Sequence, residues 1–348
     1  MIRFAWRQFR VQAAVAAGAL VVIAVVLAIT GSHLVHVYDT SVATCKANRG
    51  SSAVCVNAVT NTYRFLQDAL PVLVIVVPAL IGIFWGAPLV ARELETGSCR
   101  LAWTQSVSRS RWLFVKLGVV GVSSMVAAGL LALMVTGWSS PIEKVSPNRF
   151  SPSLFSVLGI APIGYAAFAF AFGVTAGLLI RRTLPAMAAT LLAFVGARLA
   201  VTYWVRPHLM SPVKTVMALK QSYGTGISQS STGTGLTFLP PSVNIPNAWI
   251  YSNEVVNRSG HAPTTQFLQS ACRAVLSGSA APVNHPVRNP NSGFPECFGR
   301  VAAKFHEVLT YQPASRYWAF QWYETTIFVG AALVLAGLCF WWLRHRVT

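Results

Sequence analysis

One short polar segment combines carboxylates, arginines and an aromatic side chain at a spacing that suits recognition of another protein. Residues 91–109 read ARELETGSCRLAWTQSVSR. Glu93 and Glu95 end a predicted helix, Gly97 interrupts it, and an amphipathic stretch follows in which Trp103 is available for packing. A short helix held by rigid elements on both sides can transmit a push from a soluble partner to those elements. The residue pattern by itself predicts a docking site.

Two ionisable side chains lie inside apolar runs. Arg198 and Glu324 each stand about seven residues from the end of their run, which at ~1.5 Å per residue puts both ~10 Å below the same membrane surface. An isolated charge at mid-membrane costs at least ~2.5–3.5 kcal/mol, so such groups usually pair or line a wet cavity. We predict an intramembrane ion pair between Arg198 and Glu324 with a structural role. The alternative is that each side chain extends independently to the lipid headgroups.

Four of the six cysteines fall two by two into the same connecting loops. These candidates for disulfide bonds are Cys45 with Cys55, and Cys272 with Cys297. Disulfide bonds need an oxidising compartment, which the outer side of a membrane supplies. We therefore predict one disulfide in each loop, with four free thiols as the alternative.

The remaining signatures argue against chemistry within this chain. The seven histidines show neither an H-E-x-x-H motif nor the spacing of metal ligands, so we expect no metal site. No G-x-x-x-x-G-K-[ST] run is present to cradle a nucleotide phosphate. No Ser/His/Asp set can be assembled from the sequence. We expect neither a catalytic residue nor a cofactor in this chain, and a membrane enzyme is a minor alternative.

The composition indicates that much of the protein surface faces lipid rather than water. Of the 348 residues 54% are hydrophobic and only 10% are charged, whereas a soluble domain carries about 25% charged residues. The net charge of +18 comes from basic residues at the ends of apolar runs and in loops. They form no continuous basic stripe with interleaved aromatic residues, so we expect membrane lipids rather than nucleic acid as the partner.

Six apolar segments reach the ~20 residues that a helix needs to cross a bilayer. They cover about residues 11–30, 70–90, 113–138, 154–180, 184–205 and 317–343. We interpret the first as an uncleaved anchor, because its apolar core is longer than that of a signal peptide. Its flank, residues 1–10, alternates arginines with apolar residues and predicts a short interfacial helix. The alternative for this flank is an extension of the first membrane helix.

The predicted fold class is an all-α polytopic membrane protein with about six transmembrane helices. Short connections rich in Lys and Arg alternate with longer ones that are poor in them, which places both termini in the cytoplasm. The predicted domains are a membrane domain (1–205), an extracytoplasmic disulfide-linked loop domain between helices five and six (206–316), and the sixth span with its tail (317–348). Within the loop domain, apolar spacing predicts helices near 264–276 and 300–309.

These segments resemble a known family. The run from Arg92 to Gly97, followed by Ser106 to Arg109, is similar to the R-E-x-x-x-G … P-x-S-R loop of ABC-2-type permeases, although Val107 replaces the proline that many members carry. The resemblance is closest to an actinobacterial branch of the family. The further matching runs are WRQFR (6–10), FWGAPL (84–89) and FWWLR (340–344).

The resemblance implies a permease subunit in a bacterial plasma membrane, driven by a separate ABC ATPase that binds ATP and Mg. Two permease chains, here as a homodimer, would assemble with two ATPase chains and export an amphipathic substrate such as an antibiotic or a lipid. The residues implied in or beside the ATPase-coupling loop are Arg92, Glu93, Glu95, Gly97, Arg100, Trp103 and Arg109. The sequence leaves open an ATPase-linked sensor or a gradient-driven transporter, and no residue selects the substrate.

Overall fold

The structure is a computed structural model that divides the chain into two compact units. Residues 1–210 and 315–348 form the first unit, and residues 211–314 form the second. The described residues are 2–48, 61–96, 108–145, 149–221, 225–229, 235–241, 243, 245–277 and 294–345.

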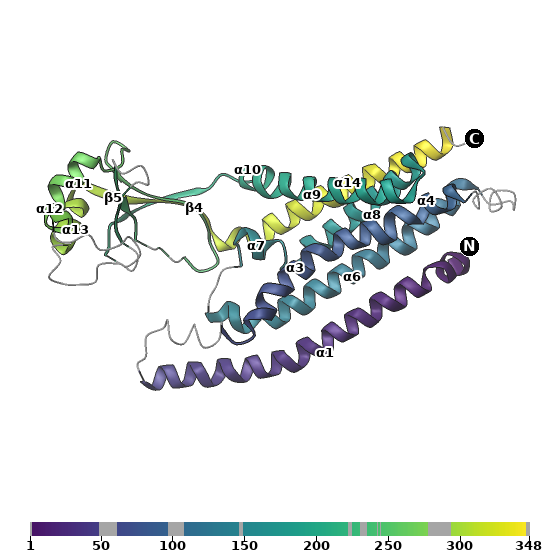
Figure 1. Ribbon diagram of the computed structural model, residues 1–348, viewed down its shortest axis with the longest axis horizontal. Helices are drawn as coiled ribbons and strands as arrows, with labels where there is room; N and C mark the ends of the chain where they lie inside the picture. The colour runs from purple at the N-terminus through teal and green to yellow at the C-terminus, as the bar shows by residue number, and fades with distance from the viewer. Residues whose placement is uncertain are drawn as a thin grey trace. The chain divides into compact units, whose positions relative to one another are not determined.

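The first unit consists of helices that run roughly side by side (Figure 1). In chain order they are α1 (Ile2–Asn48), α3 (Arg64–Ile81), the π-helical turn η1 (Gly82–Gly86), α4 (Ala87–Glu95), α6 (Arg109–Val145), α7 (Pro152–Phe155), α8 (Ala161–Ile180), α9 (Thr183–Ala200), the π-helical turn η2 (Val201–Val205), α10 (Arg206–His208) and α14 (Tyr317–His345). A 3-10 turn, η3 (Ala314–Arg316), precedes α14.

Six helical stretches among the described residues are long and apolar enough to cross a membrane. They are Phe9–Ser41, Arg64–Glu95, Ser110–Lys144, Ala161–Ile180, Thr183–His208 and Ala314–His345. The second of them runs without interruption from α3 through η1 into α4. The prediction of a helical polytopic membrane protein with about six spans is confirmed.

Helix α8 is the centre of the first unit. It packs against α14, α6, α9 and the α3–η1–α4 stretch, and most of its side chains are buried. Its sequence is rich in Ala and Gly, which lets neighbouring backbones approach closely. A Cβ atom on Gly173 would collide with the carbonyl oxygen of Gly82, and one on Gly177 would collide with that of Ala87. The contact between α8 and the second span is therefore a backbone contact.

Two boundaries differ from the sequence predictions. Helix α1 is continuous from Ile2, so the predicted separate interfacial helix at residues 1–10 is wrong and its alternative, an extension of the first span, is what the structure has. The fourth span begins at Ala161 rather than near residue 154. Residues before it form the short helix α7, which Ser151 caps, and Gly159 turns the chain with a φ of +89°.

The second unit adds strands that the sequence analysis did not predict. Its elements are β1 (Val213–Ala218), β2 (Gly226–Gln229), β3 (Leu236–Leu239), β4 (Trp249–Asn257), α11 (Thr265–Ala271), α12 (Arg273–Ser277), α13 (Phe294–Lys304) and β5 (Phe305–Gln312). An antiparallel sheet has the order β1-β5-β4, and β2 pairs with β3.

The helical prediction for residues 300–309 fails in its second half. Helix α13 ends at Lys304, and β5 follows at once. Phe305, Glu307 and Leu309 alternate with more exposed residues, which is the period of a strand with one buried face. The apolar residues between 300 and 309 are therefore divided between α13 and β5.

Candidate functional site

Glu93 joins the end of α4 to α6. Its carboxylate forms an ion pair with the ammonium group of Lys116, and both side chains are largely buried. The same ammonium lies 4.6 Å from the ring centroid of Trp112 on α6. A buried lysine needs such partners because an unpaired charge away from water is costly. Glu93 is therefore an internal link between two membrane helices rather than a side chain presented to a partner.

Glu95 joins the same end of α4 to α9. Its Oε2 accepts hydrogen bonds from Oγ1 of Thr183 at 2.6 Å and from the backbone N–H of Thr183 at 3.4 Å. Thr183 is the first residue of α9, and the N-cap residue Arg182 provides no side-chain cap of its own. A carboxylate at a helix N-terminus satisfies free N–H groups and interacts favourably with the helix dipole. Glu95 thus caps a neighbouring helix.

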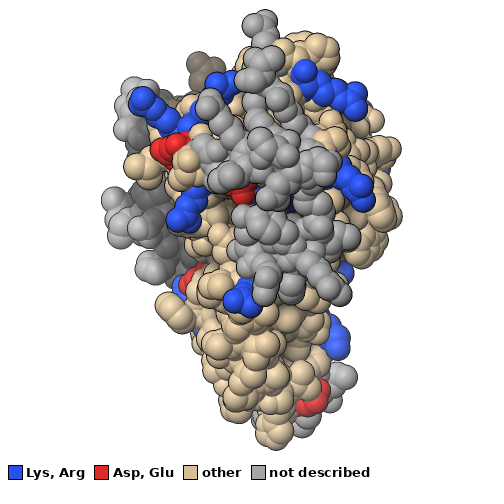
Figure 2. Space-filling model, turned by 90° about the vertical axis from the view of Figure 1, so that its right-hand side faces the viewer, with Lys and Arg blue, Asp and Glu red and all other residues tan. Residues whose placement is uncertain are grey.

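The predicted coupling segment is therefore attached at its start to two other helices. Gly97, Arg100 and Trp103 lie outside the described residues, and Arg109 begins α6 with a side chain outside them as well. Arg92 is exposed. Basic side chains gather at this end of the first unit, where acidic ones are few (Figure 2). The exposed arginines there are Arg10, Arg92, Arg111, Arg181, Arg182 and Arg344.

Glu324 is the centre of a second group of charges, near the opposite end of the helices. Nη1 of Arg198 lies 3.5 Å from Oε1 of Glu324. A closer partner is Arg206, whose Nε lies 2.9 Å from Oε2 and whose Nη2 lies 2.9 Å from Oε1. Both the Arg206 and the Glu324 side chains are fully buried. The structure thus brings the predicted pair together but gives Glu324 a second, bidentate partner.

The sequence analysis missed Arg206 because it assigned this residue to the outer loop. The π-helical turn η2 explains why the residue points inward. Phe194 and Val201 lie on the buried face of α9, and the next buried position is Arg206, five residues after Val201. In this π-helical turn the backbone N–H of Arg206 donates to the carbonyl of Val201, five residues earlier, whereas a continuing α-helix would place Val205 on that face. The sequence analysis ended the fifth apolar segment at residue 205. Only an extension of that helix past residue 205 would have placed Arg206 in the membrane domain.

Polar groups from three further positions complete this charge cluster. The Tyr165 hydroxyl donates to Oε1 of Glu324 at 2.5 Å. Arg206 donates from Nη2 to Oγ of Ser156 at 2.9 Å and from Nη1 to the Pro152 carbonyl at 3.2 Å. Because these groups come from α7, α8, α9–α10 and α14, the cluster fixes four elements of the first unit to one another.

Gln321, one turn before Glu324, closes the connection between α7 and α8. Its Oε1 accepts from the backbone N–H groups of Ile160 at 3.1 Å and Ala161 at 2.9 Å. Its Nε2 donates to the carbonyls of Phe155 and Leu158, both at 2.9 Å. The amide therefore satisfies backbone groups from the end of α7 to the start of α8.

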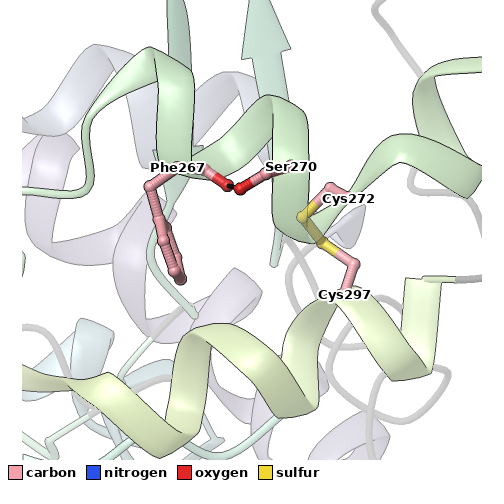
Figure 3. The surroundings of a disulfide bond; sticks show 4 residues. All are labelled: Phe267, Ser270, Cys272 and Cys297. Carbon is pink, nitrogen blue, oxygen red and sulfur yellow. Dashed lines mark hydrogen bonds between the residues drawn. A yellow bond between two sulfur atoms is a disulfide. The ribbon is translucent and has the colours of Figure 1, made fainter.

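The predicted disulfides have different outcomes. Cys272 and Cys297 form a disulfide in the second unit with Cα atoms 4.5 Å apart, and it joins the end of α11 to α13 (Figure 3). Cys45 is a residue of α1 whose side chain lies outside the described part, as does all of Cys55. Within the described residues, no group of three or more His, Cys, Asp and Glu side chains could hold a metal ion.

The six apolar helices and the charged groups that link them define a multi-pass membrane protein. The chain belongs to the ABC-2 membrane transporter related family, whose model matches residues 17–206, just over half of the 348 residues. The matched range contains Glu93, Glu95 and both arginines of the charge cluster, whereas α14 lies beyond it. No curated protein and no solved structure matches the chain. The resemblance to ABC-2-type permeases is thereby confirmed.

Proposed function

We propose that this chain is the permease subunit of an ATP-driven ABC exporter in a bacterial plasma membrane. A separate ATPase chain binds ATP and Mg and contacts the segment that joins α4 to α6. Two copies of each chain form the transporter, with the permease as a homodimer. The family supports the class of transporter, and the exposed arginines around this segment support its cytoplasmic side, because short cytoplasmic connections are rich in Lys and Arg.

The observation that carries the proposal is the double attachment of α4. Glu93 links α4 to α6, and Glu95 links it to the start of α9. A displacement of the connecting segment by the ATPase would therefore act on three spans together. Helix α9 leads in turn to Arg198 and Arg206, which pair with Glu324 on α14. Movement of α9 and α14 relative to α8 would then reshape the path of an amphipathic substrate.

The proposal is tested by isolating the tagged chain from its native membrane in mild detergent. We expect a protein with a Walker A motif to co-purify and to hydrolyse Mg-ATP. Arg92→Glu should weaken this association, because Arg92 is exposed beside the connecting segment. Arg10→Glu is the matched control, since Arg10 is exposed at the same end but lies on α1. Equal retention of the ATPase by both variants, or isolation of no ATPase, would refute the proposal.

A second candidate is an ATPase-linked sensor, which the compact second unit favours. That unit contains its own sheet and disulfide and follows directly after α10. In this case a ligand of the second unit would change the ATPase rate of the assembled complex without being transported. Deletion of residues 211–314 with a short linker in their place would separate the two functions, because an exporter would keep basal ATP hydrolysis and a sensor would lose its response.

A further inference from the structure

Two guanidinium groups share a single carboxylate in the charge cluster. Arg206 satisfies both oxygens of Glu324 at 2.9 Å and also donates to Ser156 and Pro152. Each of its three guanidinium nitrogens therefore donates at least one hydrogen bond. Among the described residues, the charged side chains that meet here are Arg198, Arg206 and Glu324, so the cluster carries one excess positive charge.

Arg198 carries that excess charge. Its Nη1 lies 3.5 Å from Oε1 of Glu324, and this oxygen already accepts hydrogen bonds from Arg206 and from Tyr165. Nη1 is buried, and no hydrogen-bond acceptor in the described part of the chain reaches it. The guanidinium lies 3.9 Å from the ring centroid of Tyr165, a favourable contact that does not neutralise it. An uncompensated charge within a membrane protein calls for a counter-ion.

The surroundings of Arg198 restrict which anion can reach it. The side chain is 11% exposed, at the margin of the outward face of α9. The neighbours Val195 and Leu199 on that face are apolar and exposed. Further along the same span lie the exposed aromatic residues Tyr203 and Trp204, which is typical of the headgroup level of a membrane. Arg198 thus lies ~8 Å from that level at ~1.5 Å per residue, within reach of a lipid phosphate when a long side chain extends toward it.

We propose that Arg198 binds the phosphate of an acidic membrane phospholipid whose acyl chains lie along the exposed apolar face of α9. The phosphate supplies the missing negative charge where the Arg198 side chain is exposed to the lipid face. The apolar chains cover Val195 and Leu199. The bound lipid would neutralise the cluster where α8, α9 and α14 meet, and this site is independent of the proposed ATPase contact.

Native mass spectrometry of the full-length chain in detergent tests the proposal. The chain is titrated with phosphatidylglycerol and, separately, with phosphatidylcholine. We expect one phosphatidylglycerol molecule to be retained about tenfold more strongly than phosphatidylcholine. Both lipids present the same phosphate acceptor, but in phosphatidylcholine the choline cation offsets the negative charge that Arg198 needs. Arg198→Gln should abolish the preference, and Arg198→Lys should keep most of it. Arg182→Gln, an exposed arginine at the other end of α9, is the matched control and should leave this molecule bound.

Four results would overturn the proposal. The first is equal retention of both lipids by the unmodified chain, a measurement that needs no variant to fold. The second is loss of phosphatidylglycerol from the Arg182 variant rather than from the Arg198 variant, which would assign binding to exposed basic residues. The third is full competition by soluble sn-glycerol 3-phosphate, which would show that a free anion suffices. The fourth is a change of oligomeric state in Arg198→Gln while the unmodified chain shows no lipid preference. In that case the partner of Arg198 would be a second copy of the chain and not a lipid.

Discussion

At the scale of residues, buried charges that link helices decide how this membrane protein is held together. Glu93 with Lys116 and Glu324 with Arg206 are both pairs in which a carboxylate on one helix meets a cation on another. Removal of one member leaves the other buried without its counter-charge, which costs more than replacing both by apolar groups. The two pairs therefore fix geometry more than they add stability.

Arg206→Gln should destabilise the chain more than Arg198→Gln. Arg206 is fully buried with four hydrogen bonds, whereas Arg198 approaches Glu324 only at 3.5 Å. We expect a loss of about 2–4 kcal/mol for Arg206→Gln, because buried hydrogen bonds to Glu324, Ser156 and Pro152 are lost while Arg198 still provides Glu324 with a counter-charge. Thermal unfolding in detergent measures both variants. In the double variant Arg206→Gln/Glu324→Gln the two losses should be less than additive, because each variant already removes the same contact. A double variant as unstable as the sum of the single ones would contradict the pairing.

Glu307→Gln should change how the stability of the second unit depends on pH. Burial raises the pKa of the Glu307 carboxyl above its usual value, although Asn253 beside it acts in the opposite direction. The protonated form therefore favours the folded state, and stability should fall as the pH rises above about 4.3, the ordinary glutamate pKa. Hydrogen-exchange protection of β5 in the full-length chain should decline from pH 5 to pH 8. If Glu307→Gln shows the same decline, another group is responsible.

At the scale of elements, close backbone packing around α8 determines the arrangement of the spans. Gly173 faces Gly82 so closely that no Cβ fits. Gly173→Ala should therefore force α8 and η1 apart and cost about 1–3 kcal/mol, as overpacking of a core does. Gly196 on α9 has open space around its Cα, so Gly196→Ala is the matched control and should be neutral or slightly stabilising. Equal unfolding temperatures for the two variants would contradict this packing.

The elements also show which features the sequence could predict. Length and hydropathy identified the spans, because a helix that crosses a bilayer needs a run of consecutive apolar residues, and such a run can be recognised in the sequence alone. The inward position of Arg206 could not be predicted in this way, since it depends on the π-helical turn η2. The sequence analysis did pair Arg198 with Glu324, because a charge in an apolar run needs a partner wherever the fold places it. Strand β5 was missed because Phe305 and Leu309 continue the apolar spacing of α13.

At the scale of the whole molecule, the first unit contains both groups of charges that the proposed function needs. The first residue of α9, Thr183, contacts Glu95 of α4, and Arg198 lies near the other end of α9. The π-helical turn that follows α9 brings Arg206 to Glu324. On our proposal, ATP hydrolysis by the partner moves the segment after α4, and α9 carries that movement toward α14. The links made by Glu93 and Glu95 are then required for coupling but not for association with the ATPase.

The most direct test measures Mg-ATP hydrolysis by the assembled complex when both links are removed. Glu93→Gln/Glu95→Gln should still retain the ATPase, while stimulation of hydrolysis by the permease should fall by about tenfold, within the usual range of coupling energies. Glu254→Gln, an exposed glutamate of β4, is the matched control and should have no effect. Unchanged stimulation in the double variant would contradict the claim that these carboxylates couple the ATPase to the membrane helices.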